Sequence, residues 1–135
     1  MKTPLRVATF LLVFVLLISS VPIAKATEIQ PRFTYVNSIS TSLTFDVGGN
    51  AICNGKVIAN TPKTVKIVCK LQKYVNDSWV TLKQWNKEGT AQTNISATYA
   101  VTSGSVYRIY TIGIVLDSYG NELETVTITE AAFYP

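Results

Sequence analysis

The sequence contains no histidine, and this absence excludes several kinds of catalytic site. Histidine is the commonest general base and a common metal ligand, so Ser–His and Cys–His nucleophile pairs and His-ligated metal sites are excluded. The two cysteines are too few for a four-thiolate zinc site within one chain. Glycoside hydrolysis needs only two carboxylates, but the candidates Asp46, Asp77, Glu88 and Asp117 stand singly at expected turns, where aspartate is favoured for its local hydrogen bonds. We therefore expect no enzymatic activity, no metal and no cofactor.

One acidic turn allows a second interpretation. The segment DSYGNE, residues 117–122, offers oxygen-bearing side chains close together, the ligand type that calcium prefers. It lacks the ligand density of an established calcium loop, and a hairpin turn alone accounts for Asp, Gly and Asn at these positions. We favour the turn.

The first 26 residues have the pattern of a signal peptide. A short basic segment, residues 1–6, precedes an unbroken apolar run from Val7 to Val21. Ala24 and Ala26 then give the small-x-small pattern that signal peptidase accepts. The alternative is an uncleaved membrane anchor, which usually needs about 20 apolar residues. We expect cleavage after Ala26 and a secreted chain that begins at Thr27.

Removal of this segment leaves almost no net charge. Lys2, Arg6 and Lys25 are removed with it, so the twelve basic residues fall to nine against eight acidic ones. A net charge near +1 is no electrostatic footprint for nucleic acid. We expect no nucleic-acid partner and, after cleavage, no contact with a membrane.

Alternation of apolar and polar residues with period 2 is the clearest signal in the mature chain. It predicts half-buried strands at Ala51–Ala59 and at Val65–Val75, with the odd-numbered residues inside. Further strands follow at short spacing, and no helical period appears after the signal peptide. About seven strands in residues 27–135 predict a single antiparallel immunoglobulin-like β-sandwich. A closed barrel is the alternative.

The segment DVGGNA must turn the chain between two strands whose apolar residues are odd-numbered. A two-residue loop would pair odd with even residues and put one apolar set in water. A three-residue loop over Gly48–Asn50 would align Val47 with Ala51 and Phe45 with Cys53. Glycine supplies the positive φ that such a loop needs.

The two cysteines lie on the apolar faces of consecutive expected strands. If these strands belong to opposite sheets, Cys53 and Cys69 meet across the core, and an exported protein can form a disulfide there. The alternative is a pair of buried thiols that pack as small apolar groups.

Lysines and aromatic residues recur in the segment Val65–Trp85 and in the later strand near Tyr107. If VNDS turns the chain as a two- or four-residue loop, both tryptophans lie on the outer face of the sheet. A three- or five-residue loop would bury both of them. The outer-face interpretation gives a candidate ligand-binding set of Lys70, Tyr74, Trp79, Lys83, Trp85, Arg108 and Tyr110. The competing interpretation is structural, because aromatics pack across strands and lysine is a common surface residue.

Two segments carry a resemblance to known proteins. The stretch LQKYVNDSWV, Leu71 to Val80, and the strand start GSVYR, Gly104 to Arg108, resemble a group of small secreted immunoglobulin-like proteins of Gram-positive bacteria with uncharacterised function. Members typically have a cysteine in an early strand, matched here by Cys53. This chain departs from them by one extra residue in the GSVYR strand start and by a second cysteine, Cys69. The resemblance covers about Ser38 to Leu116 and implies a fold and an exported protein, but no activity.

These observations favour a non-catalytic function. We expect a secreted binding or cell-envelope-associated module whose partner is a cell-wall glycan or an anionic wall polymer, since aromatic faces stack on sugars and cations attract phosphates. The alternative is a small secreted effector, such as a bacteriocin-like or inhibitor protein, that acts through its loops. The sequence leaves the oligomeric state open.

Overall fold

The computed structural model describes residues 33–135, which form seven β-strands. These are β1 (Val36–Phe45), β2 (Asn50–Ala59), β3 (Thr64–Val75), β4 (Ser78–Thr90), β5 (Gln92–Ala100), β6 (Ser105–Leu116) and β7 (Glu122–Tyr134). Within this part of the chain no helix is long and apolar enough to cross a membrane. The predicted all-β class is confirmed. The signal peptide predicted for residues 1–26 lies outside the described residues.

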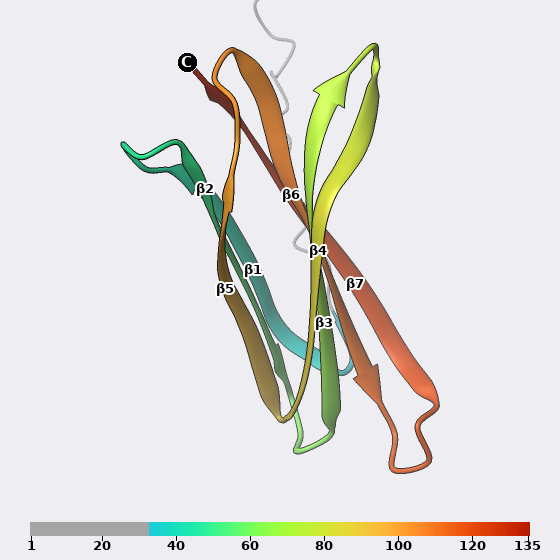
Figure 1. Ribbon diagram of the computed structural model, residues 1–135. Helices are drawn as coiled ribbons and strands as arrows, with labels where there is room; N and C mark the ends of the chain where they lie inside the picture. Colours follow the sequence, from blue (N-terminus) through green and yellow to red (C-terminus); the bar gives the residue numbers. More distant parts are fainter. Residues whose placement is uncertain (1–32) are drawn as a thin grey trace, which may run out of the picture. The chain divides into compact units, whose positions relative to one another are not determined.

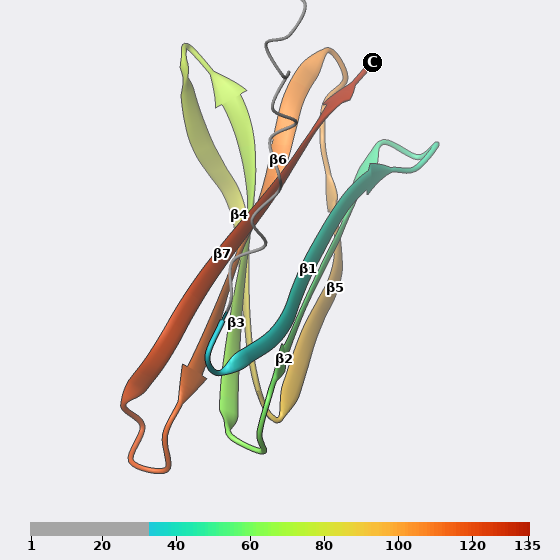
Figure 2. The same ribbon diagram turned by 180° about the vertical axis from the view of Figure 1, so that it is seen from behind.

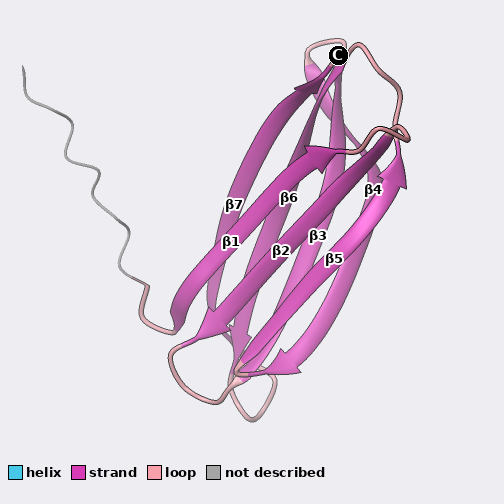
Figure 3. Cartoon of the chain, turned by 90° about the vertical axis from the view of Figure 1, so that its left-hand side faces the viewer, coloured by secondary structure: helices cyan, strands magenta, loops and turns pink. Residues whose placement is uncertain are grey.

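The strands pair into two antiparallel sheets that pack face to face (Figures 1 and 3). One sheet has the order β1-β2-β5 and the other the order β4-β3-β6-β7, and the chain changes sheet after β2, β4 and β5. This is the predicted immunoglobulin-like sandwich, and the closed-barrel alternative is wrong. In constant-type immunoglobulin domains the fourth strand joins the sheet of the first two. Here β4 pairs with β3 instead, which widens the outer face of that sheet to four strands.

Tyr107 fastens the connection between β5 and β6. Its side chain is 1% exposed, and its hydroxyl donates to the carbonyl oxygen of Thr102 at 2.6 Å and accepts from the Thr102 N–H at 3.1 Å. A tyrosine near the start of the strand after this crossing, bonded to the backbone a few residues upstream, recurs in immunoglobulin-like domains. Tyr107 and Ile109 both point into the core, and Arg108 and Tyr110 therefore point to the outer face of the sheet.

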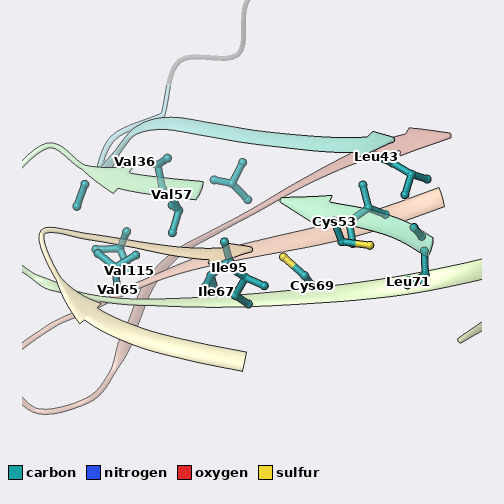
Figure 4. Close-up of a cluster of buried hydrophobic side chains, with 14 of the residues drawn as sticks. Val36, Leu43, Cys53, Val57, Val65, Ile67, Cys69, Leu71, Ile95 and Val115 are labelled. Atoms are coloured by element: carbon teal, nitrogen blue, oxygen red, sulfur yellow. The ribbon is translucent and has the colours of Figure 1, made fainter. Parts of the chain in front are cut away.

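The core between the sheets uses one face of each strand, because successive side chains of a strand point to opposite sides. The predicted inner residues of β2 and most of those of β3 are buried there (Figure 4). The buried apolar cluster consists of Val36, Leu43, Ala51, Cys53, Val57, Ala59, Val65, Ile67, Cys69, Leu71, Ile95, Tyr107, Ile109, Val115 and Val126. Val75 was predicted inside but is 37% exposed, because β3 continues past Lys73, the last residue that pairs with β6.

The β1–β2 loop has the predicted three residues but different ones. The N–H of Asp46 donates to the carbonyl oxygen of Asn50 at 3.0 Å, so the loop is Val47–Gly49, and Phe45 pairs with Ala51. The predicted register is therefore wrong by two residues, although odd positions still pair with odd ones. The side chain of Asp46 explains the shift, because its Oδ1 accepts from the N–H groups of Gly48 and Asn50, both at 2.9 Å. Val47 is left fully exposed at the tip.

The β6–β7 loop repeats this arrangement, so the spacing D-x-x-G-N marks both loops. Asp117 Oδ1 accepts from the N–H groups of Tyr119 at 2.9 Å and Asn121 at 2.8 Å, and Gly120 has a φ of 83°, the value also found at Gly49. The turn interpretation of DSYGNE accounts for this geometry, because the carboxylate of Asp117 closes its own loop.

Both cysteines are free thiols in the core, one from each sheet (Figure 4). The disulfide considered from the sequence is therefore not formed in this structure, and the buried-thiol alternative describes the pair. Burial raises the pKa of Cys53 to about 11, with a further contribution from Cys69. Burial also raises the pKa of Cys69, whose Sγ lies 3.4 Å from the hydroxyl of Thr111. Both groups stay protonated at neutral pH, which makes them poor nucleophiles.

Glu124 closes the edge of the sandwich at which β1 lies beside β7 (Figure 2). Its carboxylate accepts three backbone hydrogen bonds, from the N–H groups of Thr34 at 2.9 Å, Tyr35 at 3.1 Å and Val36 at 2.8 Å. One side chain thus holds the segment that leads into β1 and positions Val36 in the core.

We predict that Glu124→Gln lowers the free energy of unfolding by about 1 kcal/mol at pH 7, because an amide nitrogen would face a backbone N–H and the charge would be lost. Burial acts to raise the pKa of Glu124, but the N–H bonds, led by that of Val36, hold it below the ordinary value of 4.5. A lowered folded-state pKa contributes stability that is complete above pH 4.5 and is lost as the pH falls through the folded-state value.

Chemical denaturation at neutral and acidic pH checks this prediction. The difference between wild type and Glu124→Gln should close on acidification, whereas Glu130→Gln, an exposed change on the same strand, should have little effect at any pH. A gap of constant size down to pH 2 would contradict the role of the carboxylate.

We predict that Gly55→Ala destabilises the fold by about 1–3 kcal/mol, the usual cost of overpacking a core. A Cβ at Gly55 would lie 2.6 Å from the Sγ of Cys69 and 3.2 Å from the Cδ1 of Ile67. Cys69→Ala removes the closer atom. Urea unfolding of the two single variants and the double variant should therefore show a double-variant loss smaller than the sum, and strict additivity would argue against this contact.

Candidate binding face on the four-stranded sheet

The β3–β4 hairpin turns through two residues, Asn76 and Asp77. Both have positive φ, 50° and 62°, as type I′ turns require, and their short polar side chains tolerate this conformation. The turn pairs Val75 with Ser78 and Tyr74 with Trp79. The two-residue alternative from the sequence is confirmed, and it places the Tyr74 and Trp79 side chains on the same outer face.

A β-bulge at Leu82 changes the orientation of the rest of β4. Gln72 pairs with Thr81 but Leu71 pairs with Lys83, so Leu82 is an extra residue on β4. Beyond the bulge, Trp85 pairs with Cys69 and therefore lies on the core side, where it and Leu82 pack against the buried cluster. The prediction that Trp85 faces outward is wrong for this reason.

The prediction that Lys83 belongs to the binding set on the outer face is also wrong. It pairs with the buried Leu71 and so shares the inner side of the sheet, where it remains exposed because β4 is an edge strand. An extra residue in one strand moves every later side chain to the other face. The parity of the sequence could not show this change.

The other five predicted residues come together on the outer face, and Gln72, which the sequence pattern does not single out, joins them. The guanidinium of Arg108 on β6 lies between two rings, 4.3 Å from the centroid of Trp79 and 5.6 Å from that of Tyr110. Its Nε donates to Gln72 Oε1 at 2.6 Å. We call Gln72, Trp79, Arg108 and Tyr110 the Arg108 stack.

Two further predicted residues border the Arg108 stack. Tyr74 packs against Trp79 with ring centroids 5.1 Å apart and is 44% exposed. Lys70 is the direct cross-strand neighbour of Tyr110. We call the Arg108 stack together with Lys70 and Tyr74 the aromatic face. In Figures 1 and 2 the turn end of the β3–β4 hairpin, which carries Tyr74 and Trp79, stands away from the three-stranded sheet.

The surroundings of the aromatic face contain no carboxylate on the sheet. The outward positions of the four strands at this end are occupied by Trp79, Thr81, Gln84, Lys70, Gln72, Tyr74, Val106, Arg108, Tyr110, Thr129, Ala131 and Phe133. Two of them are cationic and none is acidic. The acidic residue nearest in the strand register, Glu130 on β7, pairs with the buried Ile109 and is therefore directed to the other side of the sheet. Asp77 lies in the turn, and Glu88 lies farther along β4. Arg108 is therefore neutralised by no neighbour on this face.

The apolar character of this side extends beyond the aromatic face. Phe133 is 59% exposed, and the outward residues of β6 continue with Ile112 and Ile114, which are half-buried. The opposite face of the sandwich is different in kind. A shallow hollow there is lined by polar groups of Ser40, Ser42, Asn54, Lys56 and Asn94, with no aromatic ring. The two outer faces thus offer different chemistry, and only one combines aromatic rings with uncompensated cations.

Residues 33–135 contain no group of three or more Cys, Asp or Glu side chains placed to hold a metal ion. No protein-family model matches the chain, and no curated protein matches it significantly. The similarity to secreted proteins of Gram-positive bacteria stays a prediction, and the aromatic face is the candidate functional site.

We predict that Arg108→Ala changes the fluorescence of Trp79 alone. In a Trp85→Phe background, in which Trp79 is the single tryptophan of the chain, loss of the guanidinium should shift emission to the red and increase quenching by acrylamide. In a Trp79→Phe background the same substitution should leave the emission of Trp85 unchanged. The free energy of unfolding should fall by about 0.5–1 kcal/mol, the value of an exposed cation–π contact. Equal responses in both backgrounds would contradict the placement of the tryptophans.

Proposed function

We propose that the protein is a secreted, non-catalytic β-sandwich that binds a glycan or an anionic polymer of the cell envelope through its aromatic face. The observation that carries the proposal is the Arg108 stack with Tyr74 at its border, a group of rings and a guanidinium on one side of a rigid sheet. The absence of histidine supports the non-catalytic part of the proposal.

The geometry suits a polymer of sugar units. Aromatic rings present large apolar surfaces at a small cost in side-chain entropy, and each carries a polar group at its edge that can bond to a hydroxyl. Tyr74 and Trp79 lie at one end of the face, and Tyr110 lies two rows farther along the sheet beside Lys70. An extended ligand can therefore contact several rings at once.

The rigidity of the face favours binding over a purely structural role. The rings belong to strands that are hydrogen-bonded on both sides or held by a tight turn, and Arg108 is fixed by Gln72. A preorganised surface loses less entropy when a ligand binds. Exposed apolar surface of this kind commonly marks an interaction site.

A second candidate function is supported by one observation. Val47 is fully exposed at the tip of the Asp46–Asn50 loop, whose backbone is held by the side chain of Asp46. A rigid loop that presents one apolar side chain is suited to a secreted effector, such as a bacteriocin-like or inhibitor protein.

We predict that Trp79→Ala lowers the affinity of residues 27–135 for purified cell-wall polymers about tenfold or more, the loss expected when an aromatic anchor of a binding site is truncated. Isothermal titration calorimetry or a pull-down with insoluble walls measures it. Tyr119→Ala is the matched control, because Tyr119 is 89% exposed in the β6–β7 loop at the opposite end of the strands.

The result also separates the two candidate functions. Loss of binding in Trp79→Ala but not in Val47→Ala supports the aromatic face. Wild-type binding in Trp79→Ala, with loss of a biological activity in Val47→Ala, would instead favour the loop-based effector.

A further inference from the structure

We infer that the ligand of the aromatic face carries an oxyanion, a phosphodiester or a carboxylate, and that Arg108 is the group that binds it. This inference rests on the proposed function and narrows the class of polymer. It follows from how Arg108 is held and from what surrounds it.

The Arg108 stack leaves the oxyanion-binding part of the guanidinium unused. The arginine side chain has five N–H donors. Within residues 33–135, the side chain of Arg108 makes one hydrogen bond, from Nε to Gln72 Oε1. The two Nη atoms carry the remaining donors, which bind carboxylates and phosphates in a bidentate manner. The rings of Trp79 and Tyr110 fix the plane of this group. Arg108 is thus preorganised as a planar donor.

The partner that holds Arg108 is neutral. A half-buried arginine gains most from a carboxylate, because its charge is then paired as well as hydrogen-bonded. Gln72 supplies an amide oxygen instead, and no carboxylate occupies the outward positions around it. The positive charge is therefore oriented but not cancelled, and Lys70 adds a second cation in the adjacent row.

A neutral glycan would use only part of this arrangement. Aromatic rings stack on sugar rings, and sugar hydroxyls can accept from the guanidinium, but a neutral ligand leaves the positive charge unpaired, whereas an oxyanion binds it with charge-assisted hydrogen bonds. Rings and cation together match a polymer in which sugar or polyol units alternate with oxyanions. Teichoic-acid-like chains offer phosphodiesters and uronic-acid chains offer carboxylates, so both contain the inferred chemistry.

Gln72→Glu is the sharpest test, because it places a carboxylate beside Arg108 while keeping an oxygen to accept from Nε. If Arg108 only braces the hairpin, the new ion pair should preserve or raise stability and leave binding unchanged. If Arg108 binds the oxyanion, the new carboxylate competes with it. We then expect the affinity for a poly(glycerol phosphate) chain or a polyuronate to fall about tenfold or more, since a charge-assisted contact is lost.

The binding affinity of the protein is compared for three polymers of similar length. These are poly(glycerol phosphate), a polyuronate and a neutral glucan, each titrated at low and high salt. Binding of at least one anionic chain that is tighter than glucan binding and weakens with salt supports the inference, and the preferred chain identifies the oxyanion. Lys56→Gln, a cation removed from the opposite outer face, should leave all affinities unchanged.

Two results would overturn the inference. Binding of the glucan as tight as that of the anionic chains, lost in Trp79→Ala but retained in Gln72→Glu, would leave the proposed function standing and remove the oxyanion. Binding of none of the three polymers by the wild type would remove both proposals. Circular dichroism of each variant confirms that a loss of binding does not reflect unfolding.

Discussion

The β-bulge at Leu82 is the constraint that places the two tryptophans of the β3–β4 hairpin on opposite faces of the sheet. Without the extra residue, Trp79 and Trp85 would lie on the same side of β4, because both positions are odd-numbered. With it, the first tryptophan stays outside against Arg108 and the second turns inside, opposite Cys69. The bulge therefore directs Trp85 to the side of the core, while Trp79, which precedes the bulge and is placed by the Asn76–Asp77 turn, contributes its ring to the aromatic face. It also disrupts the regular edge of β4, a feature that discourages unwanted strand pairing.

The sheet that carries the aromatic face is apolar on both sides along β6. Inward residues such as Tyr107 and Ile109 belong to the core, and outward residues such as Tyr110 and Ile112 form the exposed side. Strands that read as continuous apolar runs are normally covered on both faces. Here the outer face is covered by no other part of residues 33–135, and this unusual exposure supports the proposal that a ligand contacts it. Within the Arg108 stack, the guanidinium is held in place by Gln72 and the two rings, so it would provide a positioned polar contact for that ligand.

Much of the fold could be predicted from alternation alone. Val65, Ile67, Cys69 and Leu71 are all fully buried, because a half-buried strand has to place every second residue inside. The strand count follows from the same pattern and from the spacing of the turns, which favour a two-sheet sandwich but are also compatible with a closed barrel. The two-residue turn at Asn76 is also among the alternatives that parity allows, and both of its residues tolerate positive φ.

The remaining features depend on interactions that a parity argument does not contain. The register of β1 and β2 is set by the side chain of Asp46, and the repeat of D-x-x-G-N at Asp117 was a signal that could have revealed it. The orientation of Trp85 depends on one unpaired residue. In the sequence, Gln72 has the pattern of an ordinary surface residue. Its role in the site is to accept the hydrogen bond from Arg108, and that contact cannot be read from the sequence because the two residues are 36 positions apart.

The most direct test of the account is amide chemical-shift mapping by NMR during titration with an anionic wall polymer. The account predicts that the largest shifts fall on residues 70–81 and 106–110, with little change on the outer side of β1, β2 and β5. Shifts concentrated on the three-stranded sheet or on the loops, with β3 and β6 unaffected, would contradict the aromatic face as the binding surface.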